Sequence, residues 1–512
     1  MASCCSRLSL TSPFLSKLIA PSRLHHHPSY ARLVPLLPPS SLSRLCSATC
    51  SAATSIQILC PDAGRSPAIA RNVIDVLEER GLIESLTHED IKAACARPFS
   101  TPVKVYCGFD PTAESLHLGN LLGLIVLSWF QRCGHVPFAL LGGATVRVGD
   151  PSGKSVERPT LDEDTIERNL KGVVANIEKV LKVRENGSSE NAWQSEEGMR
   201  MHPARVLNNY EWWSKFSLLQ FLRDVGKHAR VGTMMSKESV KTRLNSEEGM
   251  SFTEFSYQLL QGYDFVHLYK NEGVSIQLGG SDQWGNIISG TDLIKKLLHQ
   301  GAAAYGLTFP LLLKSDGTKF GKSEGGAIWL SPSMLSPYKF YQHLFATPDA
   351  DVIMFLKRLT FLSLQEIEEL ERAMSLPAYI ANSAQRKLAE EVTRFVHGEE
   401  GLEEAVRATA ALAPGGTTQL DWRSMEAIAA DLPSFSTSLS SVEGAALVDL
   451  CVSSGLSASK GAARRLIKQG GLYVNNLKIE DEGKIIGQED IVDGKMLLLS
   501  AGKKNKMVIR LQ

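Results

Sequence analysis

Residues 149–155, Gly-Asp-Pro-Ser-Gly-Lys-Ser, have a composition that could bind phosphate. The P-loop of nucleotide hydrolases needs a glycine, four spacer residues and then Gly-Lys-Ser. Val148 occupies the position of the first glycine, so the pattern is incomplete and a generic nucleotide hydrolase is not favoured. Other stretches of the chain must therefore explain what this loop binds.

A second stretch, residues 111–120, combines hydrogen-bond donors with the start of a helical pattern. Gly119 lacks a side chain, which allows a ligand to approach the backbone closely. His117 and Thr112 can donate hydrogen bonds to an anionic ligand such as phosphate. A lone histidine usually has a structural role, but two lysines farther along the chain favour the functional interpretation.

Those lysines lie in residues 319–323, Lys-Phe-Gly-Lys-Ser. Lys319 and Lys322 are separated by a phenylalanine and a glycine, and lysine is a compact, flexible cation that suits phosphate groups. An isolated lysine-rich turn is often only a solvated surface loop. Here the apolar run at residues 308–314 predicts a strand, which places the lysines in a loop at a strand end.

The elements that must position these residues begin with a strand, a helix and a second strand. Residues 103–110 predict the first strand, residues 111–134 the helix and residues 136–145 the second strand. Such a βαβ unit implies a parallel sheet with both faces covered. Ligands of these sheets bind beyond the carboxyl ends of the strands, where Asp110 and the glycine-rich loop are expected.

The rest of the chain is predicted to be mainly helical. Residues 161–245 and 337–413 have helical patterns, and Gly398 is predicted to be a C-cap within the second. Residues 274–286 predict a further strand that leads into a glycine-rich turn. Stretches rich in Pro, Gly and Ser predict linkers at residues 412–419 and 431–441.

The composition is that of an ordinary globular protein. The chain has 512 residues, 43% hydrophobic and 21% charged, and its 55 basic and 55 acidic residues balance. A nucleic-acid partner must therefore be held by local basic patches. No stretch reaches the roughly 18 apolar residues of a membrane helix, so no membrane association is expected.

The first sixty residues differ from the rest. They are rich in serine and contain no acidic residue, since the first is Asp62. Their basic residues are Arg7, Lys17, Arg23, Arg32 and Arg44. This composition is typical of an organellar transit peptide, for the chloroplast, the mitochondrion or both. The cysteines outside it, Cys95, Cys107, Cys133 and Cys451, have no metal-ligand spacing, so neither a metal site nor a disulfide framework is expected.

Five stretches together resemble one family. They are YCGFDPTAESLHLGN, GDPSGK, SFTEFSYQLLQGYDF, GGSDQWGN and KFGKS. In order and spacing they are similar to bacterial-type tyrosyl-tRNA synthetases, which are class I aminoacyl-tRNA synthetases, and the resemblance extends from about Ser66 to the C-terminus. It implies an α/β fold with four parts after the leader (1–60). These are a Rossmann-like parallel-sheet catalytic domain with a dimerisation insertion (66–336), an α-helical domain on the anticodon side (337–413), a linker (414–441) and a small α+β S4-like RNA-binding domain (442–512).

The resemblance implies the activation of L-tyrosine by ATP, with release of pyrophosphate, and transfer of tyrosine to the 3′ end of tRNA(Tyr). ATP would enter with Mg²⁺ as a substrate, and no tightly bound cofactor is expected. The implied tyrosine-binding residues are Tyr106, Asp110, Asp150, Tyr257, Gln261, Asp264 and Gln277. Tyr106 and Asp264 would meet the phenolic hydroxyl, and the others would lie towards the amino group or the adenylate.

ATP and the reacting phosphate involve two further sets of residues. The implied catalytic residues are Thr112, His117, Asn120, Lys154, Arg158, Lys319, Lys322 and Ser323. The implied ATP-binding residues are Cys107, Gly108, His117, Gly119, Asn120, Asp282, Gln283 and Lys322. Asn120 stands where the family pattern has a second histidine, and its amide still donates a neutral hydrogen bond. Side chains alternate along a strand, so Tyr106 and Cys107 are expected on opposite faces and share one wall only if the strand bends.

The C-terminal part resembles the S4 RNA-binding domain. Residues 457–476 place Arg464, Arg465 and Lys468 on one helix, followed by Gly470 and an asparagine-rich hairpin. Such basic side chains bind the phosphates of structured RNA. Residues 221–244 resemble the segment through which family members form homodimers.

Two other classes remain as alternatives. A tryptophanyl-tRNA synthetase would share the fold and mechanism, but the pair Tyr106 and Asp264 and the S4-like tail argue against it. A synthetase-derived RNA-binding protein, such as a splicing cofactor, would not need the chemistry of His117, Asp150 and the two lysines.

Overall fold

The computed structural model describes most of the chain after residue 70. The described residues are 71–96, 101–154, 156–181, 193–194, 200–298, 301, 303–323, 326–412, 425, 429, 432–502 and 505–512. They belong to one compact unit, Ser66–Gln512. The predicted transit peptide lies outside the described residues. Within them, no helix is long and apolar enough to cross a membrane.

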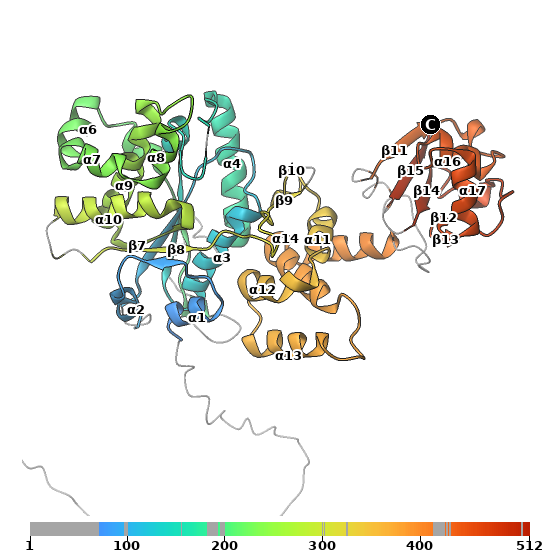
Figure 1. The fold of residues 1–512 in the computed structure, drawn as a ribbon, viewed down its shortest axis with the longest axis horizontal. Coiled ribbons are helices and arrows are strands. Elements are labelled where there is room, and N and C mark those ends of the chain that lie inside the picture. Colours follow the sequence, from blue (N-terminus) through green and yellow to red (C-terminus); the bar gives the residue numbers. More distant parts are fainter. Residues whose placement is uncertain are drawn as a thin grey trace, which may run out of the picture. The chain divides into compact units, whose positions relative to one another are not determined.

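The centre of the first domain after the leader is a six-stranded sheet with the order β1-β8-β7-β2-β3-β6. Figure 1 labels β7 and β8 of this sheet. Its strands are β1 (Ser85–Leu86), β2 (Lys104–Phe109), β3 (Val136–Leu141), β6 (Arg205–Asn208), β7 (Val274–Gly280) and β8 (Tyr305–Phe309). All neighbouring pairs are parallel except β1 with β8. The predicted parallel-sheet α/β class is therefore confirmed.

Helices cover both faces of this sheet, as the parallel pairing requires. One apolar core contains Cys107 of β2 and Leu124 of α3. The other contains Tyr106 of β2, Phe265 of α9 and Ile294 of α10. The helices of the domain are α1 (Val73–Glu79), α2 (Asp90–Ala94), α3 (Leu118–Arg132), α4 (Glu163–Val180), α5 (Tyr210–Trp213), α6 (Leu218–Asp224), α7 (Val231–Met235), α8 (Glu238–Leu244), α9 (Phe252–Glu272) and α10 (Trp284–Leu298).

Several predicted boundaries were wrong. The helix predicted from residue 111 begins at Leu118, because residues 111–116 form turns and His117 is the N-cap. The strand predicted over 136–145 ends at Leu141, before a 3₁₀ turn. The strand predicted over 308–314 is confined to Tyr305–Phe309. The range predicted to be mainly helical, 161–245, also contributes β6 to the edge of the sheet.

The region after residue 336 is helical, as predicted. Its helices are α11 (Pro337–Phe345), α12 (Asp349–Leu359), α13 (Leu364–Met374) and α14 (Ser383–Ala411). Gly398 has φ 76° and interrupts α14 without ending it, since helical structure resumes at the next residue. The predicted C-cap is thus a break inside one long helix.

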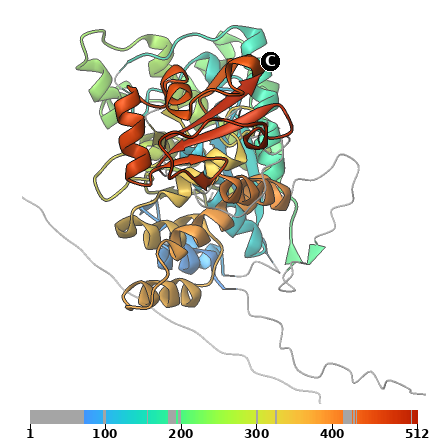
Figure 2. The ribbon, with the colours of Figure 1, turned by 90° about the vertical axis from the view of Figure 1, so that its right-hand side faces the viewer.

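The C-terminal domain has a five-stranded sheet with the order β11-β15-β14-β12-β13 and its own apolar core. In Figure 2 this domain is drawn in red, with helices beside its strands. Its elements are β11 (Ser434–Thr437), α16 (Leu447–Ser453), α17 (Lys460–Lys468), β12 (Leu472–Val474), β13 (Leu477–Lys478), β14 (Met496–Ala501) and β15 (Asn505–Leu511). Strand β11 lies in the range predicted to be a linker. Asn475 and Asn476 both have positive φ, as a tight hairpin between β12 and β13 requires.

Two short hairpins complete the fold of the described residues. One pairs β4 (Trp193–Gln194) with β5 (Arg200–Met201). The other pairs β9 (Lys322–Ser323) with β10 (Gly326–Ala327), so the lysine-containing motif forms the first strand of a small hairpin.

Candidate active site

A cavity of about 400 Å³ lies beyond the carboxyl ends of the parallel strands. Such sheets bind their ligands at this position. Its walls include eighteen of the residues that the sequence marked for tyrosine, ATP or catalysis. They are Tyr106, Cys107, Gly108, Asp110, Thr112, His117, Gly119, Asn120, Asp150, Lys154, Arg158, Tyr257, Gln261, Asp264, Gln277, Asp282, Gln283 and Lys319. The side chains of Lys322 and Ser323 lie outside the described part of the structure.

The pair Tyr106 and Asp264 lies at the buried end of the site. Tyr106, from β2, is 1% exposed, and its hydroxyl has no hydrogen-bond partner among the described residues. Asp264, from α9, is also 1% exposed. Since both side chains line one cavity, a ligand hydroxyl between them would meet a donor and an acceptor.

Three N–H groups hold the Asp264 carboxylate. The indole nitrogens of Trp212 and Trp213 donate to Oδ1 at 2.9 and 2.7 Å. Asn209 Nδ2 donates to Oδ2 at 3.0 Å. The sequence had marked none of these three residues. Asn209 is the N-cap of α5, which follows β6, and Trp212 and Trp213 are its last two residues.

Burial raises the pKa of Asp264 to about 7, although its three hydrogen-bond donors act in the opposite direction. Burial also raises the pKa of the Tyr106 hydroxyl, and the nearby Asp264 charge adds to this effect. Tyr106 therefore stays protonated and able to donate at neutral pH, while Asp264 changes its charge close to neutrality.

A second carboxylate, Asp110, lies at the end of β2. Tyr257 donates its hydroxyl to Asp110 Oδ2 at 2.8 Å, and Thr145 donates to Oδ1 at 2.7 Å. Burial, followed by the charge of Asp150, raises the pKa of Asp110 to about 6. The resemblance had predicted that Tyr257 lies with Asp150. Its hydroxyl instead donates to the neighbouring carboxylate, Asp110. Gly142 keeps this corner open, because a Cβ there would lie 1.7 Å from Asp110 Oδ1.

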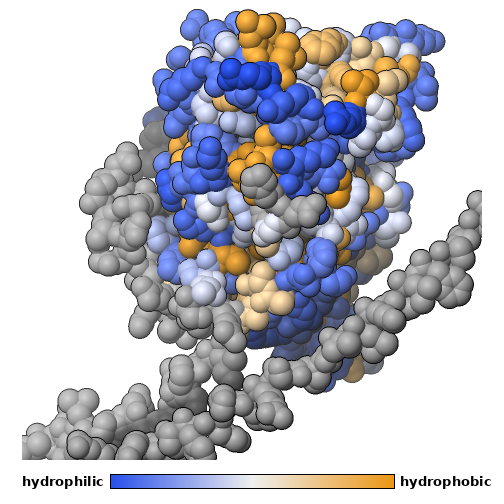
Figure 3. Space-filling model, turned by 90° about the vertical axis from the view of Figure 1, so that its left-hand side faces the viewer, coloured by the Kyte–Doolittle hydropathy of each residue, from blue (hydrophilic) through white to orange (hydrophobic). Residues whose placement is uncertain are grey.

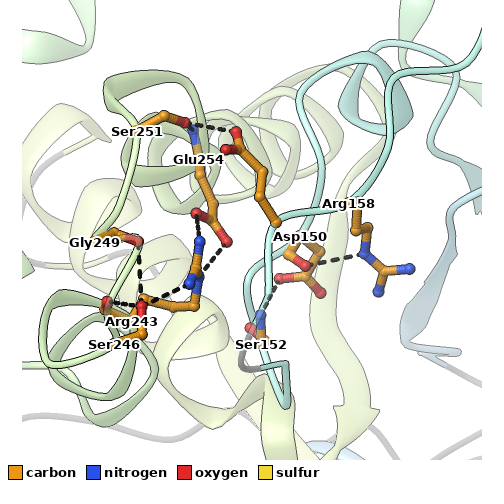
Figure 4. Close-up of polar contacts among 9 residues, drawn as sticks. Asp150, Ser152, Arg158, Arg243, Ser246, Gly249, Ser251 and Glu254 are labelled. Atoms are coloured by element: carbon orange, nitrogen blue, oxygen red, sulfur yellow. Dashed lines mark hydrogen bonds and ion pairs between the residues drawn. The ribbon is translucent and has the colours of Figure 1, made fainter.

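The glycine-rich loop folds around Asp150 (Figure 4). Asp150 accepts the Ser152 N–H at 2.9 Å and the side-chain amide of Gln283 at 2.8 Å. Arg158 donates to the Asp150 backbone carbonyl at 3.1 Å, which closes the loop. The loop thus presents a buried carboxylate, not the row of backbone N–H groups of a P-loop.

Two amide oxygens in the cavity wall lack partners among the described residues: those of Gln261 and Gln277. The Gln261 nitrogen donates weakly to Gln283, at 3.3 Å. Unpaired buried acceptors are costly unless a ligand satisfies them. Together with the Asp150 carboxylate, these oxygens suit a ligand ammonium group.

The N-terminus of α3 borders the cavity, and a capping box satisfies part of its backbone. His117 Nδ1 accepts the Asn120 N–H at 3.3 Å, and Asn120 Oδ1 accepts the His117 N–H at 3.1 Å. The Asn120 oxygen is therefore occupied, and its amide nitrogen is the group that can meet a ligand. A Cβ on Gly119 would lie 2.9 Å from His117 Cε1, so this glycine makes room for the imidazole. Helix N-termini attract anions such as phosphate.

The lysine-containing motif lies against the same helix end. Lys319 lines the cavity, and its backbone bridges to Leu313. A Cβ on Gly321 would lie 3.1 Å from the Gly119 nitrogen, so the two glycines let the motif approach the start of α3 closely. This contact places the motif beside the N-terminus of α3.

Tyr106 and Cys107 do lie on opposite faces of the sheet, as alternation predicts. Both nevertheless line the cavity. The reason is that the cavity lies across the end of the sheet and reaches both of its faces. The predicted conflict between the two side chains therefore does not arise.

The three basic residues predicted to bind RNA lie on one helix of the C-terminal domain. Arg464, Arg465 and Lys468 are all exposed on α17. Lys468 forms an ion pair with Glu482 at 3.3 Å. No group of three or more His, Cys, Asp or Glu that could hold a metal ion occurs in the described residues.

Comparison with known proteins identifies the family. Residues 99–413 match the model of tRNA synthetases class I (W and Y), and residues 424–509 match a tyrosine–tRNA ligase SYY-like C-terminal domain. The chain is 62% identical to the chloroplastic/mitochondrial tyrosine–tRNA ligase of Arabidopsis thaliana, over 88% of this chain and 86% of that protein. It is 54% identical to the tyrosine–tRNA ligase of Protochlamydia amoebophila, over 86% of this chain and 99% of that one.

A solved structure agrees with these matches. The C-terminally truncated mitochondrial tyrosyl-tRNA synthetase of Aspergillus nidulans superimposes with a TM-score of 0.55 at 33% identity, covering 66% of this chain and 93% of that one. The fold, the cavity with its marked residues and both domain matches lead to one assignment. The chain belongs to the class I tRNA synthetases of the tryptophan and tyrosine group.

Proposed function

We propose that the protein is a tyrosine–tRNA ligase. It converts L-tyrosine and ATP to tyrosyl-adenylate and pyrophosphate, and then transfers the tyrosyl group to the 3′ end of tRNA(Tyr). The observation that carries this proposal is that the Tyr106 hydroxyl and the Asp264 carboxylate both line the cavity, with the hydroxyl unpartnered among the described residues and close enough for the Asp264 charge to raise its pKa. High identity to proteins named tyrosine–tRNA ligase supports it.

The pair favours a phenol over the other aromatic amino acids. A phenolic hydroxyl donates to Asp264 and accepts from Tyr106, which satisfies both buried groups. An indole N–H only donates, and phenylalanine has no polar atom on its ring, so either would leave a buried polar group unpaired. A tryptophanyl-tRNA synthetase is therefore the weaker interpretation.

The amino end of tyrosine would be held by Asp150 with the oxygens of Gln261 and Gln277. This places the substrate carboxylate beyond the end of the sheet, towards the start of α3. The carboxylate attacks the α-phosphate of ATP, the bond to pyrophosphate breaks, and no covalent bond to the protein forms. Positioning and charge stabilisation supply the catalysis.

ATP with Mg²⁺ is the second substrate. His117 and Thr112 would donate to its phosphates at the N-terminus of α3, next to the backbone of Gly119. Lys319 and Lys322, with Ser323, would neutralise the departing pyrophosphate. Lys154 and Arg158 would reach the same group from the glycine-rich loop, while Cys107, Gly108, Asp282 and Gln283 would contact the nucleoside.

Tyrosine-dependent exchange of pyrophosphate into ATP tests the first step. The purified protein is expected to catalyse exchange with tyrosine, at least about fivefold less with tryptophan, which leaves one buried group unpaired, and at least about thirtyfold less with phenylalanine, which leaves two, since each buried unpaired group costs about 1–3 kcal/mol. Asp264→Ala should abolish exchange with tyrosine while ATP still binds. Exchange that prefers tryptophan would refute the proposal.

The second step needs the tRNA, and we propose that the C-terminal domain binds it through Arg464 and Arg465 of α17. The helical region over residues 337–413 would lie on the anticodon side.

For the cellular location, we propose the chloroplast, the mitochondrion or both. The leader has a transit-peptide composition, and a 62% identical relative is named as a chloroplastic/mitochondrial enzyme. Import of a fluorescent fusion carrying residues 1–70 tests this, and a cytosolic signal would contradict it.

We also propose a homodimer. Apolar side chains on α6, α7 and the start of α9 are strongly exposed, including Leu218 (68%), Leu219 (78%), Val231 (60%) and Phe252 (74%). Figure 3, which views the side of the molecule that carries α6 and α7, shows hydrophobic side chains grouped among hydrophilic ones. Several strongly exposed large apolar side chains on one side of a protein are typical of an interface.

A further inference from the structure

Two adjacent tryptophans donate to the same carboxylate oxygen, Asp264 Oδ1. We infer that Trp213 is a positioning residue for the choice of amino acid: its indole N–H fixes the Asp264 carboxylate in the orientation that accepts a phenolic hydroxyl. Trp213 does not line the cavity, so it acts on the substrate through Asp264 alone. This inference rests on the proposed tyrosine specificity.

The hydrogen bonds of Asp264 leave a defined place for a ligand. A carboxylate offers about four lone-pair positions. The two indoles occupy Oδ1, and Asn209 occupies one position of Oδ2. The remaining position is on Oδ2, and Asp264 faces the cavity. Without Trp213, Oδ1 would have an open position, and the carboxylate could turn away from the orientation that suits the phenol.

The shorter of the two indole contacts, at 2.7 Å, belongs to Trp213. Its ring is held by an aromatic cluster, in which Phe216, Phe221 and Tyr263 lie 5.2, 5.8 and 5.2 Å from it between ring centres. Trp212 is held separately, stacked on His267 at 4.1 Å. The two indoles therefore have independent supports, and removing one N–H leaves the other in place.

Trp213 also favours the ionised form of Asp264. Each N–H donor lowers the pKa of this carboxyl, against the larger effect of burial. The titratable groups that feel the Asp264 charge or act on it are Asp110, Tyr106, Tyr257 and Tyr263. All four are unchanged when only the indole N–H is removed, so a shift in the titration of Asp264 would report the loss of that one donor.

The test is Trp213→Phe, which keeps an aromatic ring and removes the N–H. In tyrosine-dependent pyrophosphate exchange, the KM for tyrosine is expected to rise about tenfold, as for loss of one hydrogen bond to a charged group. The kcat and the KM for ATP should change less than about twofold, because the phosphate end of the site is untouched. The kcat/KM for phenylalanine should also change less than about twofold, so discrimination between the two amino acids falls.

A second readout separates positioning from a structural role. The acidic limb of kcat/KM for tyrosine should move to higher pH in Trp213→Phe, because the pKa of Asp264 rises when a donor to its charged form is lost. The deficit of the variant relative to the wild type should therefore grow as the pH falls. A variant damaged only in folding would lose the same factor at every pH and with both amino acids.

Trp129→Phe is the matched control. Trp129 lies on α3, and its indole nitrogen is buried without a hydrogen-bond partner among the described residues. The same substitution there removes an N–H that holds nothing, so the KM for tyrosine and the pH profile should match the wild type.

Each result has a definite meaning. A KM for tyrosine and an acidic limb that are unchanged in Trp213→Phe would overturn the inference, as would equal losses for tyrosine and phenylalanine. Failure of the wild-type protein to exchange with tyrosine would instead overturn the proposed function, so the two failures are distinguishable.

Discussion

At the scale of single residues, Asp264 is expected to set the pH range of tyrosine activation. Burial raises its pKa to about 7. Three of the four lone-pair positions of the Asp264 carboxylate are already occupied, so the fourth is open to a hydrogen bond from the phenolic hydroxyl only while the group is ionised. Because burial raises this pKa, the ionised form prevails only as the pH rises through about 7. The kcat/KM for tyrosine should therefore fall up to about tenfold per unit below that pH. Pyrophosphate exchange measured from about pH 8 to about pH 6 checks this.

Phenylalanine is the control substrate for this prediction. It makes no contact with Asp264 through a hydroxyl, but it shares the rest of the site, including Asp110, whose pKa burial raises to about 6. Exchange with phenylalanine is slow and must be measured at high enzyme concentration. The acidic limb of its kcat/KM profile should reflect only the groups that both amino acids contact, such as Asp110. Identical acidic limbs for the two amino acids would exclude Asp264 as the group responsible.

The residues of the site divide into those that sequence could predict and those it could not. Asp150, His117 and Lys319 belong to short motifs whose residue types suggest their chemistry, and the fold brings them to one cavity. Asn209, Trp212 and Trp213 were missed because their shared partner lies 51 to 55 residues away. A tryptophan also normally indicates an apolar core, and no local pattern shows which indole N–H has a polar partner.

At the scale of elements, a buried ion pair between Arg243 and Glu254 links α8 to the start of α9 (Figure 4). Arg243 and Glu254 are 1% and 3% exposed and share two hydrogen bonds of 2.9 Å. About one turn farther along, α9 begins to carry the residues that line the cavity. Arg243→Met would leave a buried carboxylate unpaired, and the free energy of unfolding is expected to fall by about 3 kcal/mol. Urea denaturation followed by circular dichroism measures this.

Two further variants make that prediction specific. Arg407→Met, on α14, removes an exposed pair with Glu403 and should leave the unfolding midpoint unchanged. Arg243→Met combined with Glu254→Leu removes both buried charges and should recover most of the lost stability. If the single variant at Arg243 is as stable as the one at Arg407, the pair does not anchor α9.

The same helix has a second link to the glycine-rich loop. Ser251, the N-cap of α9, donates its hydroxyl to Glu157 at 2.8 Å. Asp150 and Arg158 lie in that loop, while Tyr257, Gln261 and Asp264 follow on α9. The two walls of the site are thus joined at the first turn of α9.

Elements with a clear hydrophobic pattern in the sequence were predicted, and elements without such a pattern were missed. The βαβ unit was visible because β2 and β3 are apolar and α3 is continuous between them. Strand β6 was missed because Arg205–Asn208 is a short edge strand in which every residue is half-buried, so neither alternation nor a hydrophobic run marks it. Helix α3 starts late because its first turn is fixed by the capping box of His117, and the preceding proline does not begin it.

At the scale of the whole molecule, the C-terminal domain should separate tRNA charging from amino-acid activation. Arg464→Ala with Arg465→Ala is expected to raise the KM for tRNA about tenfold and to leave pyrophosphate exchange unchanged, because phosphate contacts dominate RNA affinity. The dependence of that KM on salt should also become shallower, by about one unit of slope per lost contact.

Lys460→Ala is the control on the same helix. Lys460 is exposed but already pairs with Asp449 at 2.7 Å, so its loss should affect charging less. Equal effects of the two variants would indicate a general charge effect, and normal charging by the double arginine variant would refute the assignment of α17 as the tRNA contact.

The exposed apolar residues of α6 predict the quaternary state. Transfer of a leucine from water into an interface contributes about 1.5–3 kcal/mol, and Leu219, at 78% exposed, gains this only if a second copy covers it. A glutamate there would instead place a charge in an apolar interface in both subunits. The protein from residue 66 onwards is expected to sediment as a dimer at micromolar concentration, and Leu219→Glu as a monomer.

Ile380→Glu, at a site 76% exposed in the helical region, is the matched control and should stay dimeric. A monomeric wild type, or a dimer that survives Leu219→Glu, would show that this surface does not join two subunits.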